Sequence, residues 1–301
     1  EISTIPVAAS IGNAVFNAAS TLINPGDAVL LPVPYWVSFP EIINYAGGRV
    51  VPVATAEADG FRVTAAQLER AWVEGTKLVI INSPNNPSGA VVDRAEFSRI
   101  LELVRRRGAL LLSDECYSHF VYDGGPFSVA GLPEAKAHVV VAGSLSKTFA
   151  MTGWRIGYAL TPEPIIEAML RLQSHSTSNP TSIAQKAAEA ALRGPMDSVA
   201  QMLAEYARRR TRIIAGLNGI PDLACPEPRG AFYAYPNVSR FMRRAGVKST
   251  VELARRLLED ARVVVVPGEA FGTAEHIRIS YATSMERIEE GLRRLTRFFS
   301  A

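Results

Sequence analysis

The segment Gly143-Ser-Leu-Ser-Lys147-Thr-Phe-Ala-Met-Thr-Gly-Trp-Arg155-Ile-Gly157 directly follows the apolar run Val139–Ala142. We expect Lys147 to lie at the carboxyl end of a buried strand, where ligands bind in parallel α/β sheets. Lysine is scarce in this chain, because only five of its 32 basic residues are Lys. A lysine amine can form a Schiff base, and desolvation beside other cations makes it a nucleophile. Ser144 and Arg155 flank it with a hydroxyl and a guanidinium suited to phosphate. The alternative, a solvated Lys on a surface loop, stays open from this segment alone.

Short apolar runs of strand length alternate with helical patterns over the first half of the chain. They alternate little between apolar and polar residues, as strands buried on both faces do. The helix expected over residues 94–107 has Asp93 and Glu96 spaced as a capping box, and Gly108 ends it. This order predicts an α/β fold with a mostly parallel central sheet covered by helices. The predicted strands are Val29–Leu31, Val50–Val53, Leu78–Asn82, Ala109–Ser113, Val139–Ala142 and Ile156–Leu160.

The pattern changes near residue 180. Two long helices, Ser182–Leu192 and Met196–Leu217, are separated by Gly194-Pro195. Beyond Ile220 the sequence predicts three short strands and two helices, and the last helix is capped by Ser284. We therefore expect a large domain over residues 1–205 and a smaller α+β C-terminal domain over residues 206–301. The three short strands are Phe232–Tyr235, Val263–Val266 and Ile277–Tyr281.

Composition excludes several classes of protein. The chain has 301 residues, of which 48% are hydrophobic and 20% charged, as is ordinary for a globular protein. A net charge of +3 argues against nucleic acid as the main partner, and no apolar run is long enough to span a membrane. The N-terminus lacks the features of a signal peptide, and two cysteines form no disulfide framework. From the lack of a signal peptide, a membrane-spanning run and a disulfide framework we expect a cytoplasmic protein. The four histidines have no metal-ligand spacing, so we expect no metal site.

Three further motifs end predicted strands at the same edge of the sheet. They are Pro34-Tyr35-Trp36, Asn82-Ser-Pro-Asn-Asn86-Pro-Ser-Gly89 and Ser113-Asp114-Glu115-Cys116-Tyr117. Together with the Lys147 segment, and with Arg278 in His276–Tyr281, they make the chain resemble the class I aminotransferases of fold type I. It is most similar to the aspartate-aminotransferase-like subgroup, from about Asn13 to Phe299. The resemblance implies the cofactor pyridoxal 5′-phosphate (PLP), a homodimer, and ping-pong transfer of an amino group between an L-amino acid and a 2-oxo acid.

The resemblance also implies a role for individual residues around the cofactor ring. Lys147 would hold PLP as a Schiff base and later move a proton between the substrate Cα and the cofactor. Asp114 would pair with the pyridine nitrogen, where a carboxylate keeps the nitrogen protonated and the ring electron-withdrawing. Tyr117 and Asn86 would bond the phenolic oxygen of PLP, and Trp36 would stack on the ring. Taken singly, these residues are also explained as turn caps or packed aromatics.

The phosphate and the substrate carboxylate have their own expected ligands. Ser144 and Arg155 would hold the phosphate, helped by the backbone amides of Gly12 and Asn13, where a helix begins. Arg278 would clamp the substrate α-carboxylate bidentately, and Trp36 and Asn86 would also contact the substrate. The alternative interpretation of Arg278 is an ordinary surface arginine on a strand. The segment Gly230-Ala-Phe-Tyr233 matches a family segment that lines the small-domain side of the site, and we assign it no chemical role here.

The sequence departs from the family pattern at three places. It lacks the family segment that precedes the position of Ile5, and the bulky Ile11 interrupts the phosphate loop. The expected helix Ala14–Leu22 carries no Lys or Arg for a distal carboxylate, which weakens strict specificity for aspartate. Two alternatives to an aminotransferase stay open: a PLP-dependent lyase on the same fold, and an aminotransferase-like sensor domain of a transcription regulator.

Overall fold

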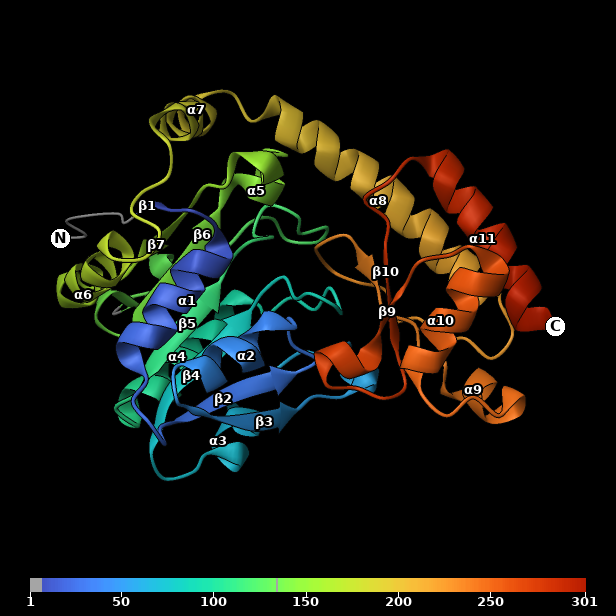
Figure 1. Cartoon of the computed structure of the whole chain (residues 1–301), viewed down its shortest axis with the longest axis horizontal. Coiled ribbons are helices and arrows are strands. Elements are labelled where there is room, and N and C mark those ends of the chain that lie inside the picture. Colours follow the sequence, from blue (N-terminus) through green and yellow to red (C-terminus); the bar gives the residue numbers. More distant parts are fainter. Residues whose placement is uncertain (1–6, 134) are drawn as a thin grey trace.

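The computed structural model describes residues 7–133 and 135–301 and contains two sheets (Figure 1). A seven-stranded sheet has the order β1-β7-β6-β5-β4-β2-β3, and a three-stranded sheet has the order β8-β10-β9. In Figure 1 the large sheet and its helices lie on the left, and the small sheet with α9, α10 and α11 lies on the right. The expected combination of an α/β domain with a smaller α+β C-terminal domain is confirmed.

All six strands predicted in the first half of the chain are present in the large sheet. Five of them run parallel, whereas β7 is antiparallel to both β6 and β1. The expectation that all six are buried on both faces is wrong for β3, because an edge strand leaves most of its residues partly exposed. The strands are β1 (Val7–Ala8), β2 (Ala28–Val33), β3 (Arg49–Ala54), β4 (Thr76–Asn82), β5 (Leu110–Asp114), β6 (Val139–Ser144) and β7 (Gly157–Leu160).

Helices cover both faces of this sheet, so successive residues of its central strands enter two different cores. On β4, Val79 and Ile81 pack towards α3 and α4, while Leu78 and Ile80 pack towards α1, α2 and α6. This two-sided burial explains why the central strands read as continuous apolar runs. The helices of this part are α1 (Ile11–Leu22), α2 (Ser38–Tyr45), α3 (Ala65–Ala71), α4 (Arg94–Arg106), α5 (Leu145–Thr148), α6 (Glu163–Ser174) and α7 (Ser182–Arg193).

The capping box predicted for α4 is half formed. Asp93 Oδ1 accepts a hydrogen bond from the Glu96 backbone N at 2.9 Å, as expected for an N-cap. The Glu96 carboxylate does not turn back to the cap. It accepts instead from the backbone N of Ala65 at 2.7 Å, and so joins the start of α3 to α4.

The small domain packs around its own sheet beyond the 22-residue helix α8 (Asp197–Asn218). Three helices follow Ile220 instead of the two predicted. The expected strand Val263–Val266 is wrong for its first three residues, because only Val266 pairs and Val264 is 77% exposed. The remaining elements are β8 (Tyr233–Ala234), α9 (Ser239–Ala245), α10 (Thr250–Ala261), β9 (Val266–Pro267), β10 (Ile277–Ser280) and α11 (Met285–Ser300).

The last helix follows its sequence pattern closely. Ser284 caps α11, and its apolar stripe is buried against α8 and α10. The stripe consists of Ile288, Leu292, Leu295 and Phe299. Among the residues that the structure describes, no helix is both long and apolar enough to cross a membrane.

Candidate active site

Three neighbouring parallel strands end at one edge of the large sheet, and each delivers a polar side chain there. Asn82 ends β4 and Asp114 ends β5, and the two residues are partners in the strand register. The Asn82 side-chain Nδ2 donates to the Asp114 carbonyl oxygen at 3.1 Å. The next strand, β6, ends at Ser144, and Lys147 follows directly on α5. The carboxyl ends of these strands therefore meet as the sequence predicts.

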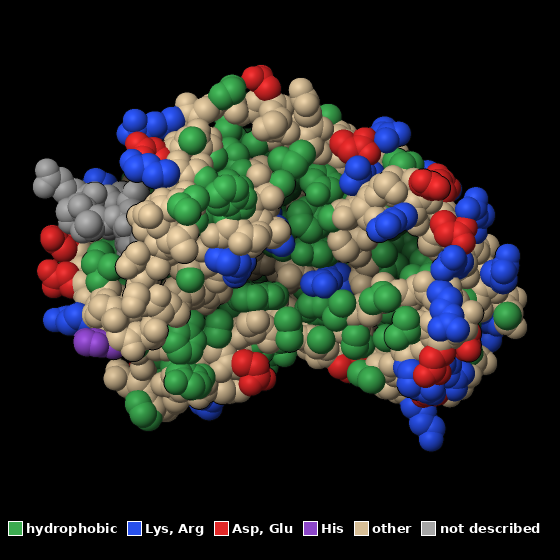
Figure 2. Space-filling model, turned by 45° about the horizontal axis from the view of Figure 1, so that its top comes forward, with side chains coloured by type: hydrophobic (Ala, Val, Ile, Leu, Met, Phe, Trp, Pro, Cys, Tyr) green, Lys and Arg blue, Asp and Glu red, His purple; other side chains and the backbone are tan. Residues whose placement is uncertain are grey.

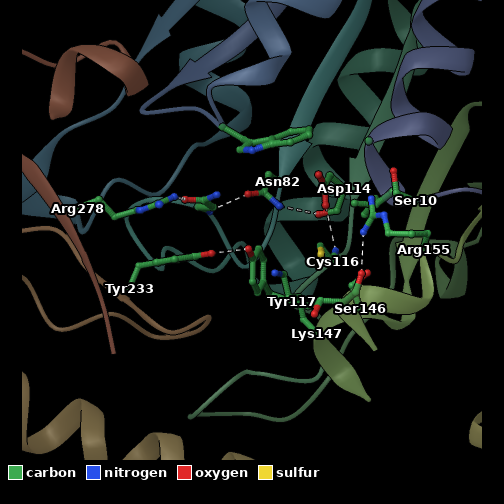
Figure 3. Close-up of a pocket in the computed structure, with 15 residues that line it drawn as sticks. Ser10, Asn82, Asp114, Cys116, Tyr117, Ser146, Lys147, Arg155, Tyr233 and Arg278 are labelled. Atoms are coloured by element: carbon green, nitrogen blue, oxygen red, sulfur yellow. Dashed lines mark hydrogen bonds between the residues drawn. The ribbon is translucent and has the colours of Figure 1, made fainter. Parts of the chain in front are cut away.

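A cavity of about 340 Å³ lies at this edge, and both domains contribute to its wall. Figure 2 shows that the molecule is hollowed between the two domains, with Lys and Arg side chains beside the hollow. In Figure 3 Arg278 and Tyr233 reach into the cavity from one side, and Asp114, Lys147 and Arg155 lie on the other. Eight of the ten residues predicted for the site line it: Gly12, Trp36, Asn86, Asp114, Tyr117, Lys147, Arg155 and Arg278.

Asp114 places a buried carboxyl in the cavity wall. Its side chain is 3% exposed, and Oδ1 accepts a hydrogen bond from the Cys116 backbone N at 3.0 Å. Burial raises the pKa of this carboxyl from its ordinary value to about 7, because desolvation penalises the charged form. A cation held against Asp114 would reverse this effect and keep the carboxylate ionised.

Two pairs of side chains join the domains across the cavity. The Tyr117 and Tyr233 hydroxyls are 2.8 Å apart, and Arg278 Nη1 donates to Asn86 Oδ1 at 2.8 Å. Burial raises the pKa of the Tyr117 phenol well above its ordinary value, so the phenol is neutral at physiological pH. Arg278 Nε is buried and has no hydrogen-bond partner. The N–H groups of Arg278 that are not bonded to Asn86 can donate to a carboxylate.

The start of helix α1 forms the opposite end of the cavity. The helix has Ser10 as its N-cap, and Ser10, Ile11 and Gly12 line the cavity. A Cβ on Gly12 would lie 3.3 Å from Trp36 Cη2, so a larger residue there would push against this ring. Arg155 lines the same region with a backbone φ of 52°, in the left-handed conformation that residues other than glycine adopt infrequently. A helix N-terminus beside a guanidinium is a favourable place for a phosphate.

Two predicted phosphate ligands do not reach the cavity. The Asn13 backbone N donates to Ser10 Oγ at 3.1 Å, so the helix cap itself uses this amide. Ser144 is the N-cap of α5, where its Oγ accepts from the Ser146 backbone N at 3.0 Å. Both residues are occupied by local capping, and the nearby Ser10 and Ser146 line the cavity in their place.

The sequence reasoning missed seven lining residues. Ser146 and Thr152 lie inside the Lys147 segment, and Ser10 and Ile11 lie inside the predicted phosphate loop. The motifs therefore contain these four residues, although none was assigned to the site. Tyr233 lies in a segment that was matched but given no role. The seven are Ser10, Ile11, Asn82, Cys116, Ser146, Thr152 and Tyr233.

Comparison with known proteins identifies the family. The sequence model described as aminotransferase class I and II matches residues 3–295. The chain belongs to the class I and II aminotransferase family. It is 43% identical to an aspartate aminotransferase of Geobacillus stearothermophilus, over 100% of this chain and 77% of the relative. It is therefore a transaminase, an enzyme that moves an amino group between an amino acid and a 2-oxo acid and depends on PLP.

Solved aminotransferase structures share the whole fold. The aspartate aminotransferase of Rhizobium meliloti superposes with a TM-score of 0.93 at 40% identity, covering 98% of this chain and 76% of that one. An aromatic aminotransferase of Pyrococcus horikoshii gives a TM-score of 0.93 at 36% identity, covering 98% and 79% of the two chains. The neighbours thus differ in their named substrates while keeping one fold.

The residues of this aminotransferase cavity fit PLP. The buried Asp114 carboxyl, with its raised pKa, matches a protonated ring nitrogen, and the amine of Lys147 matches the aldehyde. Arg155 and the start of α1 match the phosphate, and Trp36 offers an aromatic face to the ring. Among the described residues, no group of three or more His, Cys, Asp or Glu is arranged to hold a metal ion.

Proposed function

We propose that this aminotransferase uses Lys147 to anchor PLP and to carry protons, Asp114 to keep the cofactor ring protonated, and Arg278 to bind the substrate carboxylate. The observation that supports this proposal is the meeting of the three side chains in one cavity from three separate elements, α5, β5 and β10. An amine, a buried carboxyl and an arginine with a free edge are what transamination requires of a protein.

Each of these residues has one task in the proposed reaction. Arg278 binds the α-carboxylate and fixes the orientation of the amino acid. The free amine of Lys147 takes the proton from the substrate Cα and delivers it to the cofactor. The Asp114 carboxylate holds a proton on the ring nitrogen. When bound, PLP supplies an electron-withdrawing ring and an aldehyde carbon that takes up the amino group and passes it to a second substrate.

The remaining cavity residues position the cofactor. Arg155 and the backbone at the start of α1 would hold the phosphate, and Trp36 would cover the ring. Tyr117 and Asn86 would bond its phenolic oxygen. Ser10, Ser146 and Thr152 stand nearer to the cavity than Ser144 and Asn13, and we propose them as the hydroxyl ligands of the phosphate.

L-Aspartate is the first amino donor to test, because the named relatives at 40–43% identity are aspartate aminotransferases. One observation favours a broader substrate range than aspartate alone. Helix α1 carries no basic residue, and the cations that line the cavity within the described residues are Lys147, Arg155 and Arg278. All three are assigned above to the cofactor or to the α-carboxylate, which leaves none for a distal carboxylate.

We also propose that the protein is a homodimer and that its domains divide near residue 205, within α8. Exposed apolar side chains on α7 support the dimer, since Ile183 is 73% and Leu192 60% exposed beside an apolar cavity of about 620 Å³. Figure 2 shows hydrophobic side chains gathered on the upper part of the face of the molecule that it draws. Sedimentation would give the oligomeric state, and a cytoplasmic location stays a prediction.

The test of the proposed function is the visible absorption spectrum of the PLP-loaded protein, recorded before and after adding single amino acids. We expect a visible band that particular amino acids bleach without an acceptor, because the amino group stays on the cofactor. Adding a 2-oxo acid should restore the band. A band that no amino acid changes contradicts the proposal, and ammonia released without an acceptor would point to a lyase.

A further inference from the structure

We propose that Tyr233 is a positioning residue that holds the Tyr117 phenol with its hydroxyl and the Arg278 guanidinium with its ring. This inference rests on the proposed function, since it assigns Tyr117 and Arg278 to the cofactor and the substrate. Tyr233 lies on the small domain, and a single side chain would thus join the carboxylate clamp to the large-domain group beside the cofactor (Figure 3).

The two hydroxyls form a buried pair. Tyr117 is 5% and Tyr233 6% exposed, and their oxygens are 2.8 Å apart. Burial raises the pKa of both phenols, so each keeps its single O–H proton. If Tyr117 donates its proton to the cofactor, it has none left for its neighbour, and Tyr233 must then be the donor within the pair. A donated hydrogen bond polarises the acceptor phenol and makes it a better donor in turn.

The ring of Tyr233 faces the guanidinium of Arg278. The Arg278 Cζ lies 4.6 Å from the centre of this ring and 5.0 Å from that of Phe271. In the register of β8 and β10, Tyr233 is opposite Ser280, which places Tyr233 and Arg278 on the same face of the small sheet. The stacking and the bond to Asn86 together fix the guanidinium, while its Nε has no partner within the protein.

The backbone that leads into β8 holds Tyr233 firmly against the large domain. The backbone N of Ala231 donates to Phe120 O at 2.9 Å, and that of Gly230 donates to Gly89 O at 3.0 Å. A Cβ on Gly230 would lie 2.7 Å from Phe120 O and from Pro84 Cβ, so only glycine permits this approach. The segment is thus tied to the loops that carry Tyr117 and Asn86. A side chain fixed in this way can set the position of its neighbours.

The experiment compares Tyr233→Phe with Tyr233→Leu in the PLP-loaded enzyme. Tyr233→Phe removes only the hydroxyl, so the Tyr117 bond to the cofactor's phenolic oxygen weakens. That bond stabilises the form in which this oxygen carries more negative charge. This is the form in which the Schiff base between Lys147 and PLP is deprotonated. The pH midpoint of the visible band should therefore rise by about 0.5 to 1 unit, with KM for the amino acid unchanged. Tyr233→Leu should raise the midpoint too, and raise KM roughly 3- to 30-fold through the lost stacking.

Tyr235→Phe is the matched control. Tyr235 follows β8 directly and is 2% exposed, and its hydroxyl bonds Thr273 Oγ1 at 2.5 Å without lining the cavity. The Tyr235→Phe variant loses one buried hydroxyl from the same segment and should have the pH midpoint and the KM of the wild type. The titratable groups that face the Tyr117 phenol besides Tyr233 are Cys116 and Asp114, which all these variants retain.

The outcomes separate this inference from the proposed function. A Tyr233→Phe midpoint equal to that of the wild type overturns the positioning role, as does an equal change in Tyr235→Phe. A Tyr233→Leu variant with the wild-type KM overturns the support of Arg278. These titrations need only bound PLP, whose dissociation constant is measured for each variant. Wild-type enzyme that no amino acid bleaches would instead contradict the proposed function.

Discussion

The two walls of the cavity are built in different ways. The large-domain wall, with Lys147 and Asp114, lies at the ends of parallel strands and offers an amine and a buried carboxyl. The small-domain wall, with Arg278 and Tyr233, lies on a short antiparallel sheet and offers groups that bind and orient. The comparison suggests a division of labour in which the large sheet supplies reactivity and the small sheet supplies geometry.

Lys147→Ala should cause the largest loss, because the variant lacks both the anchoring amine and the proton carrier. We expect multiple-turnover transamination to fall by at least about 10⁴-fold. A steady-state assay with an amino acid and a 2-oxo acid measures this. Lys77→Ala, which removes an exposed lysine at the start of β4, is the control and should retain wild-type activity. Retained turnover in Lys147→Ala would contradict the claim that the large-domain wall supplies the reactive group.

Asp114→Asn should be the second largest effect. An amide cannot hold a proton on the ring nitrogen by charge, so we expect kcat/KM to fall by roughly 10³-fold. The visible band should persist, because Lys147 is unchanged. Activity close to the wild type in a variant that still binds PLP would show that the large-domain wall works without this carboxylate.

The same carboxyl predicts a pH dependence of the cofactor-free protein. Burial raises the pKa of Asp114 from 3.8 to about 7. Its contribution to stability is therefore complete below the unfolded pKa and is lost as the pH rises through about 7. Cofactor-free Asp114→Asn should lack this loss and be more stable than wild type at pH 8, by on the order of 4 kcal/mol. Urea unfolding of both proteins from pH 5 to 8 measures the difference, and parallel curves would contradict it.

Arg278→Lys should have the smallest of these effects and should fall mainly on KM. Lysine keeps the charge but cannot bind a carboxylate bidentately or stack as well on Tyr233. We expect kcat/KM to drop about 30-fold, or roughly 2 kcal/mol. Arg287→Lys, on the surface of α11, is the matched control. A loss in kcat with unchanged KM would mean that Arg278 takes part in the chemistry, and the two walls would not differ as proposed.

The two walls also differ in how much of them could be predicted from the sequence. Lys147 and Asp114 directly follow or end apolar runs, and parallel strands bring their carboxyl ends together, so local patterns sufficed for the large-domain wall. Tyr233 became visible as a site residue only in the structure, because its partners, Tyr117 and Arg278, are distant in sequence. Ser144 and Asn13 do not line the cavity for a local reason: each caps or joins the first turn of a helix, and a motif does not tell a cap from a ligand. Their role as phosphate ligands stays a prediction.

The sequence predictions were wrong about the burial of β3 and about most of the strand expected over Val263–Val266. The edge strand β3 has an apolar sequence but lies half exposed, and Val264 is exposed although it stands within a run of four valines. Such runs are buried on both faces only where neighbouring strands and covering helices enclose them. The sheet order, which decides which run is central, is a property of the whole chain.

The most direct test of the account is to find the residue that binds the cofactor. Borohydride reduction of the PLP-loaded protein converts a lysine Schiff base into a stable adduct, which peptide mass spectrometry can locate. The account predicts the adduct on Lys147 alone among the five lysines of the chain. An adduct on another lysine, or a loaded protein that gives no adduct, would contradict it.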